Sequence, residues 1–241
     1  MILPPTSPKD PRESLIIALD VPSARSAMDL VDRLEGQCQW FKVGLQLYLS
    51  EGFSVVTSLR NQGFNVFLDL KLHDIPNTVG QTIKTLAKTG ASLLTIHASG
   101  GSAMLQAAAE AADSIKGSPR LLAVTVLTSM GIKDLAQIGV AAPPDAQVLN
   151  LARLAIASGI TGLVCSPREV TLLRTELGES PLLVVPGIRP SGAAANDQTR
   201  TATPAEALRA GASMLVIGRP ITQAEDPAAA FAAIVSDLAA C

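Results

Sequence analysis

The sequence predicts a single α/β domain folded as a closed (β/α)8 barrel, and three observations support this. The chain has 241 residues, 48% hydrophobic and 17% charged, which is an ordinary core-forming composition. Eight short apolar runs recur with helical stretches between them. Barrels of this kind commonly take about 250 residues as one domain. We expect the barrel to occupy residues 14–241, after a proline-rich, polar tail at residues 1–13.

The eight apolar runs are the expected strands. Most of them are rich in Val, Ile and Leu on both faces, as is typical of strands in a parallel sheet that helices cover on the outside. They are residues 15–20, 40–45, 65–72, 93–98, 121–127, 162–166, 182–188 and 214–218.

Helices are expected between the runs, at residues 24–34, around 79–87, at 146–158 and at 204–210. Apolar residues recur there at helical spacing, and Gly90 follows the second stretch as a C-cap candidate. The last stretch begins with Thr203, Pro204 and Glu206, the pattern of an N-cap with proline at the first helical position. Such alternation fits a doubly wound sheet or a closed barrel, and eight repeats favour the barrel.

Two segments interrupt the alternation, a long one with several Gly and Pro at residues 128–144 and a polar one at 189–203. Both follow expected strands, so both should lie on the face where barrels carry their active sites. Long loops on that face often act as lids or ligand clamps.

Composition excludes several classes of protein. The net charge is −2, aromatic residues make up 3%, and no cluster of Lys and Arg stands out, so we expect no nucleic-acid partner. No apolar run reaches the roughly 18 residues of a membrane span, and no signal peptide is visible. The three cysteines are widely spaced, which favours reduced thiols and a cytoplasmic location.

Charged residues occur where the third strand ends, and apolar packing does not explain them. Asp69 and Lys71 alternate with leucines, so they should face the barrel interior while the leucines face the helices. Asp20 ends the first strand and Lys42 lies within the second. Opposite charges placed together offset part of the cost of burial. A purely structural ion-pair network is the alternative, but apolar layers fill barrels at lower cost.

A second pattern indicates phosphate binding. The seventh strand ends in Pro186-Gly187-Ile188-Arg189 and the eighth in Ile217-Gly218-Arg219-Pro220. Barrels commonly bind phosphate after these two strands, where glycine lets backbone amides approach the anion and arginine supplies a planar donor pair. The alternative is a turn glycine beside a surface arginine.

Several motifs together resemble those of the orotidine 5′-phosphate decarboxylase family. They occur in order over about residues 15 to 222, nearly the whole chain. They are Ala18-Leu19-Asp20, Phe41-Lys42-Val43-Gly44, Asp69-Leu70-Lys71-Leu72-His73-Asp74-Ile75-Pro76-Asn77-Thr78, His97-Ala98-Ser99-Gly100-Gly101, Leu127-Thr128-Ser129, Pro186-Gly187-Ile188-Arg189, Asp197-Gln198 and Ile217-Gly218-Arg219-Pro220. Two positions depart from the family pattern, namely Leu72, where Phe is frequent, and Asn196, where Gly is frequent.

The resemblance implies a bacterial-type TIM-barrel enzyme that converts orotidine 5′-phosphate to UMP and CO2 with neither cofactor nor metal. Lys71 would protonate C6 of the pyrimidine, with Asp69 beside the substrate carboxylate. Lys42 would join the charge array and contact the ribose, as would Asp20. Thr128 would contact the base.

For the remaining site residues, the resemblance implies phosphate binding and a shared active site. Arg189, Gln198, Gly218 and Arg219 would hold the phosphate, with Gln198 on a closing loop, and Pro186 would also line the substrate site. Asp74, Ile75 and Thr78 would reach into the neighbouring subunit of a homodimer.

Two rival functions remain open at this point. A sugar-phosphate decarboxylase of the same barrel type shares the Asp-x-Lys-x-x-Asp pattern but needs Mg²⁺ and an acidic ligand near the end of strand one or two, where this chain has the cation Lys42. The other rival is a non-catalytic nucleotide-binding barrel, and Lys71 argues against it because binding alone does not require a buried lysine at the reacting carbon. Outside the array, we expect His73 to position backbone, Trp40 and Tyr48 to pack, and Cys165 to be an unreactive buried thiol.

Overall fold

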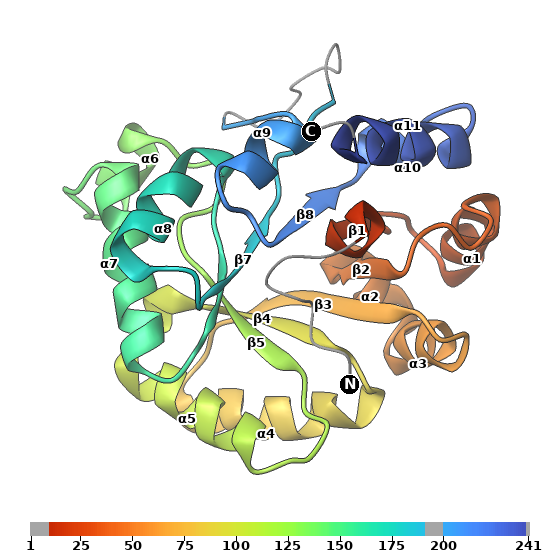
Figure 1. Cartoon of the computed structure of the whole chain (residues 1–241). Helices are drawn as coiled ribbons and strands as arrows, with labels where there is room; N and C mark the ends of the chain where they lie inside the picture. Colours follow the sequence, from red (N-terminus) through yellow and green to blue (C-terminus); the bar gives the residue numbers. More distant parts are fainter. Residues whose placement is uncertain (1–9, 191–199, 240–241) are drawn as a thin grey trace.

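A computed structural model describes residues 10–190 and 200–239 of the chain. Eight parallel strands pair in sequence order and close on themselves, so the protein is a TIM barrel of one domain (Figure 1). The strands are β1 (Leu15–Ala18), β2 (Trp40–Gly44), β3 (Asn65–Leu72), β4 (Leu93–His97), β5 (Arg120–Val124), β6 (Gly162–Val164), β7 (Leu182–Val185) and β8 (Met214–Ile217).

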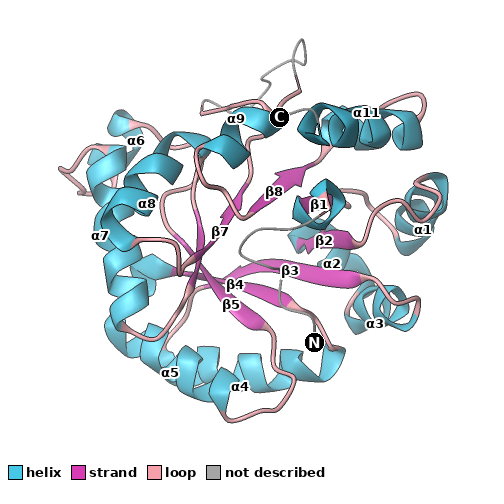
Figure 2. Ribbon diagram, viewed as in Figure 1, coloured by secondary structure: helices cyan, strands magenta, loops and turns pink. Residues whose placement is uncertain are grey.

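Helices surround the strands on the outside (Figure 2). They are α1 (Ala24–Arg33), α2 (Leu45–Glu51), α3 (Phe53–Asn61), α4 (Pro76–Leu86), α5 (Gly101–Asp113), α6 (Ile132–Gln137), α7 (Pro144–Ala157), α8 (Val170–Leu177), α9 (Pro204–Arg209), α10 (Arg219–Thr222) and α11 (Pro227–Ala239). Four short 3-10 helices, η1 (Pro11–Ser14), η2 (Ala87–Thr89), η3 (Ala98–Gly100) and η4 (Pro167–Glu169), complete the described elements. Within the described ranges, none of the helices combines the length and the apolar character that crossing a bilayer requires.

All eight expected strands are confirmed, although most end one to three residues earlier than the apolar runs suggest. The four expected helices are confirmed as well. Thr203 and Glu206 form the expected capping box of α9 with Pro204 in the first turn, and Gly90 ends η2 in the left-handed conformation that glycine adopts without strain. The segment at 128–144 is not wholly a loop, because it contains α6 and the first residue of α7.

Alternation along the strands separates two apolar layers. Inward residues such as Ile16, Trp40, Phe67 and Leu122 fill the barrel, and Trp40 is therefore a packing residue as expected. Outward residues such as Leu68 pack against the helices in a larger cluster. The apolar filling leaves the C-terminal end of the barrel to polar side chains.

The expected regular alternation of β3 is wrong in one respect. Leu68 pairs with Leu94 and Leu72 with Ile96, so four steps along β3 match two along β4, and the register shifts between them. Lys71 has a backbone φ of 50°, which is rare for a residue with a side chain. The bulge lies at the functional end of the strand, where such irregularities often aim a side chain.

Candidate active site

A cavity of about 290 Å³ opens at the C-terminal end of the barrel. Nine residues predicted from the sequence line it, and they come from six of the eight strands or the loops that follow them. They are Asp20, Lys42, Asp69, Lys71, Thr128, Pro186, Arg189, Gly218 and Arg219. The chain thus brings together the charge array and the two candidate phosphate motifs in one pocket.

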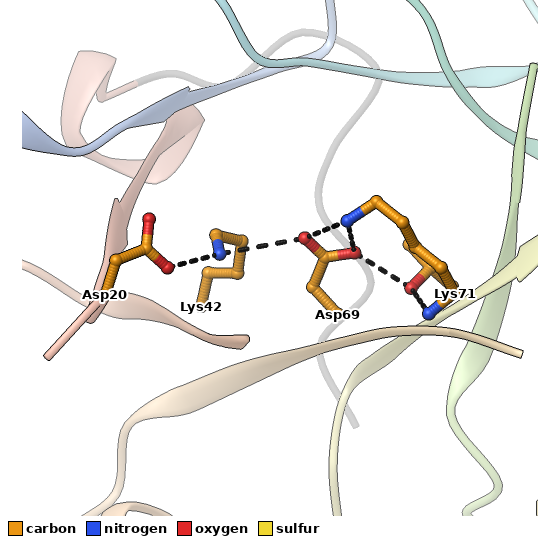
Figure 3. Close-up of polar contacts among 5 residues, drawn as sticks. Asp20, Lys42, Asp69 and Lys71 are labelled. Carbon is orange, nitrogen blue, oxygen red and sulfur yellow. Dashed lines mark hydrogen bonds and ion pairs between the residues drawn. The ribbon is translucent and has the colours of Figure 1, made fainter. Parts of the chain in front are cut away.

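Four charged side chains form an alternating row across β1, β2 and β3 (Figure 3). Lys42 Nζ lies 2.9 Å from Asp20 Oδ1 and 3.6 Å from Asp69 Oδ2. Lys71 Nζ donates to both oxygens of Asp69, each at 2.9 Å. The inward direction predicted for Lys42, Asp69 and Lys71 is confirmed.

The environment of Asp69 keeps its carboxylate charged. Burial raises the pKa of Asp69, whereas the positive charges of Lys42 and Lys71 lower it. Hydrogen bonds donated by Lys71 and by the Thr95 hydroxyl lower the pKa further, so the net pKa lies below its usual range. A carboxylate that is buried and still ionised can hold two ammonium groups in place.

Gly44 makes room for the array. A Cβ at this position would lie 3.0 Å from Lys42 Nζ and 3.2 Å from Asp20 Oδ1, closer than side-chain carbons normally come. The backbone φ of Gly44 is −92°, so the need for glycine is steric rather than conformational. This contact is the physical reason for the glycine in the Phe-Lys-Val-Gly motif, which directly precedes α2.

The two arginine motifs follow β7 and β8, and β8 pairs with β1, the strand that precedes Asp20. Gly187 has a φ of 81°, in the region that favours glycine. Arg189 donates from Nη1 to the Ile188 carbonyl at 2.8 Å, and its own amide donates to the Ala202 carbonyl at 2.9 Å. Arg189 and Arg219 both line the cavity, so they are more than surface arginines beside a turn.

Apolar side chains also line the cavity, and the sequence analysis did not identify them as site residues. Phe67, Val124, Val164 and Val216 line the cavity from inside the barrel, joined by Val126, Leu127, Cys165, Thr222 and Gln223 near the mouth. The alternation of β3, β5, β6 and β8 contains the signal for the first four, since each occupies an inward position of its strand. A pocket whose lining combines charged and apolar side chains fits a flat heterocycle that carries an anionic group.

Three predicted residues lie outside the cavity. Asp74 and Thr78 line a separate depression that also includes Lys71 and His73. Ile75 is 67% exposed, although it is a large apolar side chain. The depression adjoins the cavity through Lys71, which lines both. Gln198 lies outside the described residues.

The histidines and the pocket cysteine have no evident chemical role. The rings of His73 and His97 are 5.3 Å apart, and burial, His73 and Lys71 lower the pKa of His97. Burial raises the pKa of Cys165, in agreement with the expected unreactive thiol. Among residues 10–190 and 200–239, no three His, Cys, Asp or Glu side chains are grouped closely enough to hold a metal ion.

Comparison with known proteins places this site in a family. Residues 13–234 match the model of the "Orotidine 5′-phosphate decarboxylase / HUMPS family". Relatives named orotidine 5′-phosphate decarboxylase include one from Anaeromyxobacter sp. (strain K), 50% identical over 95% of this chain and 99% of its own length. Another, from Opitutus terrae, is 49% identical over 93% of this chain and 97% of its own length.

A solved structure agrees with the sequence relatives. The crystal structure of orotidine 5′-phosphate decarboxylase from Lactobacillus acidophilus has a TM-score of 0.82 and 40% sequence identity, and the match covers 93% of this chain and 98% of that one. The family model, the close relatives and the shared fold lead to one conclusion. This chain belongs to the orotidine 5′-phosphate decarboxylase / HUMPS family.

Proposed function

We propose that this chain converts orotidine 5′-phosphate to UMP and CO2 without a cofactor, and that Lys71 protonates C6 of the pyrimidine. The observation that carries the proposal is the row Asp20–Lys42–Asp69–Lys71 at the mouth of a pocket that Arg189 and Arg219 also line. Relatives at about 50% identity, which match this chain over nearly their whole length, are named for this activity.

The chemistry explains why a lysine is needed. Loss of CO2 from C6 leaves an electron pair in an sp2 orbital that is out of conjugation with the ring, so the electron sinks of common cofactors do not match it. A fixed ammonium beside C6 stabilises the developing carbanion and can deliver a proton to it. Lys71 Nζ is held by both oxygens of Asp69 and lines the cavity, which suits it for this role.

Phosphate binding would contribute far from the reacting carbon. Arg189, Arg219 and the backbone at Gly218 would hold the phosphate, together with Gln198. Pro186 would line the site beside them. Enzymes can use binding energy from a remote group to position the reacting one. The activation barrier of decarboxylation at C6 is high, so this reaction needs that contribution.

The remaining predicted residues would bind the nucleoside. Lys42 and Asp20 lie at the β1–β2 side of the mouth, where they would contact the ribose hydroxyls. Thr128 lies in the loop after β5, beside Val126 and Leu127, where it would contact the base.

We also propose that the active enzyme is a homodimer in which each chain completes the other's site. Asp74, Ile75 and Thr78 lie outside their own cavity yet next to Lys71, as residues donated to a neighbour would. Exposed apolar side chains support an interface on this side, because Leu45, directly after β2, is 49% exposed and Ile75, three residues after the neighbouring strand β3, is 67% exposed.

A Mg²⁺-dependent sugar-phosphate decarboxylase is the nearest rival, since the name of the family covers more than orotidine 5′-phosphate decarboxylase. The position at the end of β2 argues against it. Lys42 Nζ lies within ion-pair distance of both Asp20 and Asp69, so an ammonium already occupies the space between the carboxylates where a divalent cation would bind.

The test is an ultraviolet assay of orotidine 5′-phosphate consumption with and without EDTA. We expect rapid loss of substrate that EDTA does not slow, and stoichiometric UMP by chromatography. No consumption by folded protein would refute the proposal and favour a binding protein. Consumption that EDTA abolishes would favour a metal-dependent reaction instead.

A further inference from the structure

Strand β4 has an unusual place at this site. The described residues that line the cavity come from β1, β2, β3, β5, β6, β7 and β8 or the loops after them, but none comes from β4. The inward position of β4 nearest the charge array is Thr95, which has no exposed surface. Thr95 therefore cannot bind substrate directly, and its contacts show what it does instead.

The single hydroxyl of Thr95 bridges two members of the array. It accepts a hydrogen bond from the backbone amide of Lys71 at 2.8 Å and donates one to Asp69 Oδ1 at 2.9 Å. Asp69 Oδ1 in turn accepts from Lys71 Nζ at 2.9 Å. A closed ring of three contacts thus joins the backbone and the side chain of Lys71 through Thr95 and Asp69.

The ring lies where the backbone is least regular. The β3–β4 register shifts between Leu68 and Leu72, so the ladder of backbone hydrogen bonds is interrupted at Lys71. Lys71 also has a φ of 50°, a conformation that is unfavourable for a residue with a Cβ. The Thr95 hydroxyl replaces the missing ladder acceptor for the Lys71 amide and so holds the bulge.

We propose that Thr95 is a positioning residue that fixes the Lys71 ammonium and the Asp69 carboxylate in their reactive arrangement. The inference rests on the proposed function, because it concerns the proton donor of that reaction. Threonine suits the position because it both donates and accepts through one atom, and its branched side chain suits a strand.

The charged groups around Asp69 determine how its titration would respond. Lys42 faces it from β2, Lys71 from β3 and His97 from β4, while Asp20 on the β1 side acts through its ion pair with Lys42. Thr95 is the uncharged donor among the hydrogen bonds described for Asp69, and its bond lowers the pKa of that carboxyl. Removing the hydroxyl should therefore raise the pKa of Asp69 while Lys42, Lys71 and Asp20 stay in place.

The experiment compares Thr95→Val, which removes the hydroxyl but keeps the branched shape, with Thr95→Ser, which keeps the hydroxyl. Thr89→Val is the matched control. Thr89 is also buried, and its hydroxyl also donates to one group (the Leu86 carbonyl, 2.7 Å) and accepts from a backbone amide (Ala91, 3.2 Å), far from the cavity.

We expect Thr95→Val to lower kcat by about 10- to 100-fold, the effect of one lost hydrogen bond to a charged group, with little change in KM. The acid limb of its pH–rate profile should move to higher pH. Thr95→Ser should recover most of the rate. Thr89→Val should lose similar thermal stability but keep its kcat and its pH profile.

The same variants test the inference without turnover. Titration of carboxyl ¹³C signals in aspartate-labelled protein should show a higher pKa for Asp69 in Thr95→Val than in wild type and Thr89→Val. An unchanged Asp69 titration, or a kcat loss that Thr89→Val shares at equal stability, would overturn the positioning role. A wild-type chain that does not consume orotidine 5′-phosphate would instead refute the proposed function, and the titration would still decide the inference.

Discussion

A buried ion pair behind the pocket gives a prediction whose size follows from the structure. Arg200 Nη1 lies 2.6 Å from Glu169 Oε1, and the two side chains are only 8% and 4% exposed. Arg200 Nη2 also donates to the Leu127 carbonyl at 2.8 Å, and Glu169 Oε2 accepts from the Ser166 amide at 2.8 Å. The pair therefore ties the loop after β5, next to Thr128, to the loop after β6.

We predict that Arg200→Met lowers the free energy of unfolding by about 3–5 kcal/mol, because it leaves the Glu169 carboxylate buried without its partner. For a chain of this size, that loss corresponds to a melting temperature lower by roughly 6–20 °C. Glu169→Gln should cost less, since the amide can still accept from Ser166 and Arg200 keeps its bond to the Leu127 carbonyl.

The assay is urea unfolding of wild type, both single variants and the double variant Arg200→Met/Glu169→Gln. In the double variant no unpaired charge remains, so its loss should be smaller than the sum of the single losses by at least about 1 kcal/mol. A loss under about 1 kcal/mol for Arg200→Met, or strict additivity, would show that the pair is not energetically coupled and that the reasoning from burial is wrong.

Three further predictions concern the site. Gly44→Ala should lower kcat/KM at least about tenfold, because the new Cβ would lie 3.0 Å from Lys42 Nζ. Gly131→Ala makes the same change at another helix N-cap, where the nearest contact is 3.7 Å, and should leave kcat/KM unchanged. Equal kinetics for both variants would contradict the steric argument. The pKa of Asp69 is lowered in the folded state, so its ionic contacts stabilise the fold above the unfolded pKa of about 3.9 and lose this effect as pH falls through the folded value. Asp69→Asn should accordingly show a shallower loss of unfolding free energy than wild type between neutral pH and pH of about 3, and parallel curves would count against it. If the dimer shares its sites, mixing inactive Lys71→Ala and Asp74→Ala chains should restore about a quarter of the wild-type activity. The reason is that half of the dimers formed at random are hybrids, and each hybrid has one intact site out of two. A mixture as inactive as its components would mean that Asp74 acts in its own chain.

The strands and the composition of the site follow largely from local sequence patterns. Apolar runs locate all eight strands because strands that are covered on both faces need apolar residues at nearly every position. Because side chains along a strand alternate between its two faces, the sequence also places Lys42 and Asp69 inside the barrel. The strand ends are less well predicted, since the apolar residues Val126 and Leu127 continue beyond β5 to line the cavity.

Features that depend on contacts between distant segments could not be predicted. The bulge at Lys71 depends on a hydroxyl 24 residues away on β4, and Thr95 carries no mark in the sequence that separates it from other strand threonines. The Arg200–Glu169 pair joins residues 31 positions apart, in the segments after β7 and β6, and charged side chains are usually exposed. Gly44 stands in a recognised motif, but only the positions of Lys42 and Asp20 explain why it must be glycine.

The central claim is that Lys71 supplies the charge and the proton at C6, and one measurement tests it most directly. This is kcat at saturating orotidine 5′-phosphate for Lys71→Ala beside wild type, with Lys84→Ala on the exposed face of α4 as a control. We predict a loss of at least about 1000-fold for Lys71→Ala in a folded protein, in the range that removal of a general acid or of a charge at the reacting atom produces, and no loss for Lys84→Ala. A folded Lys71→Ala variant within about tenfold of wild type would contradict the role assigned to this lysine.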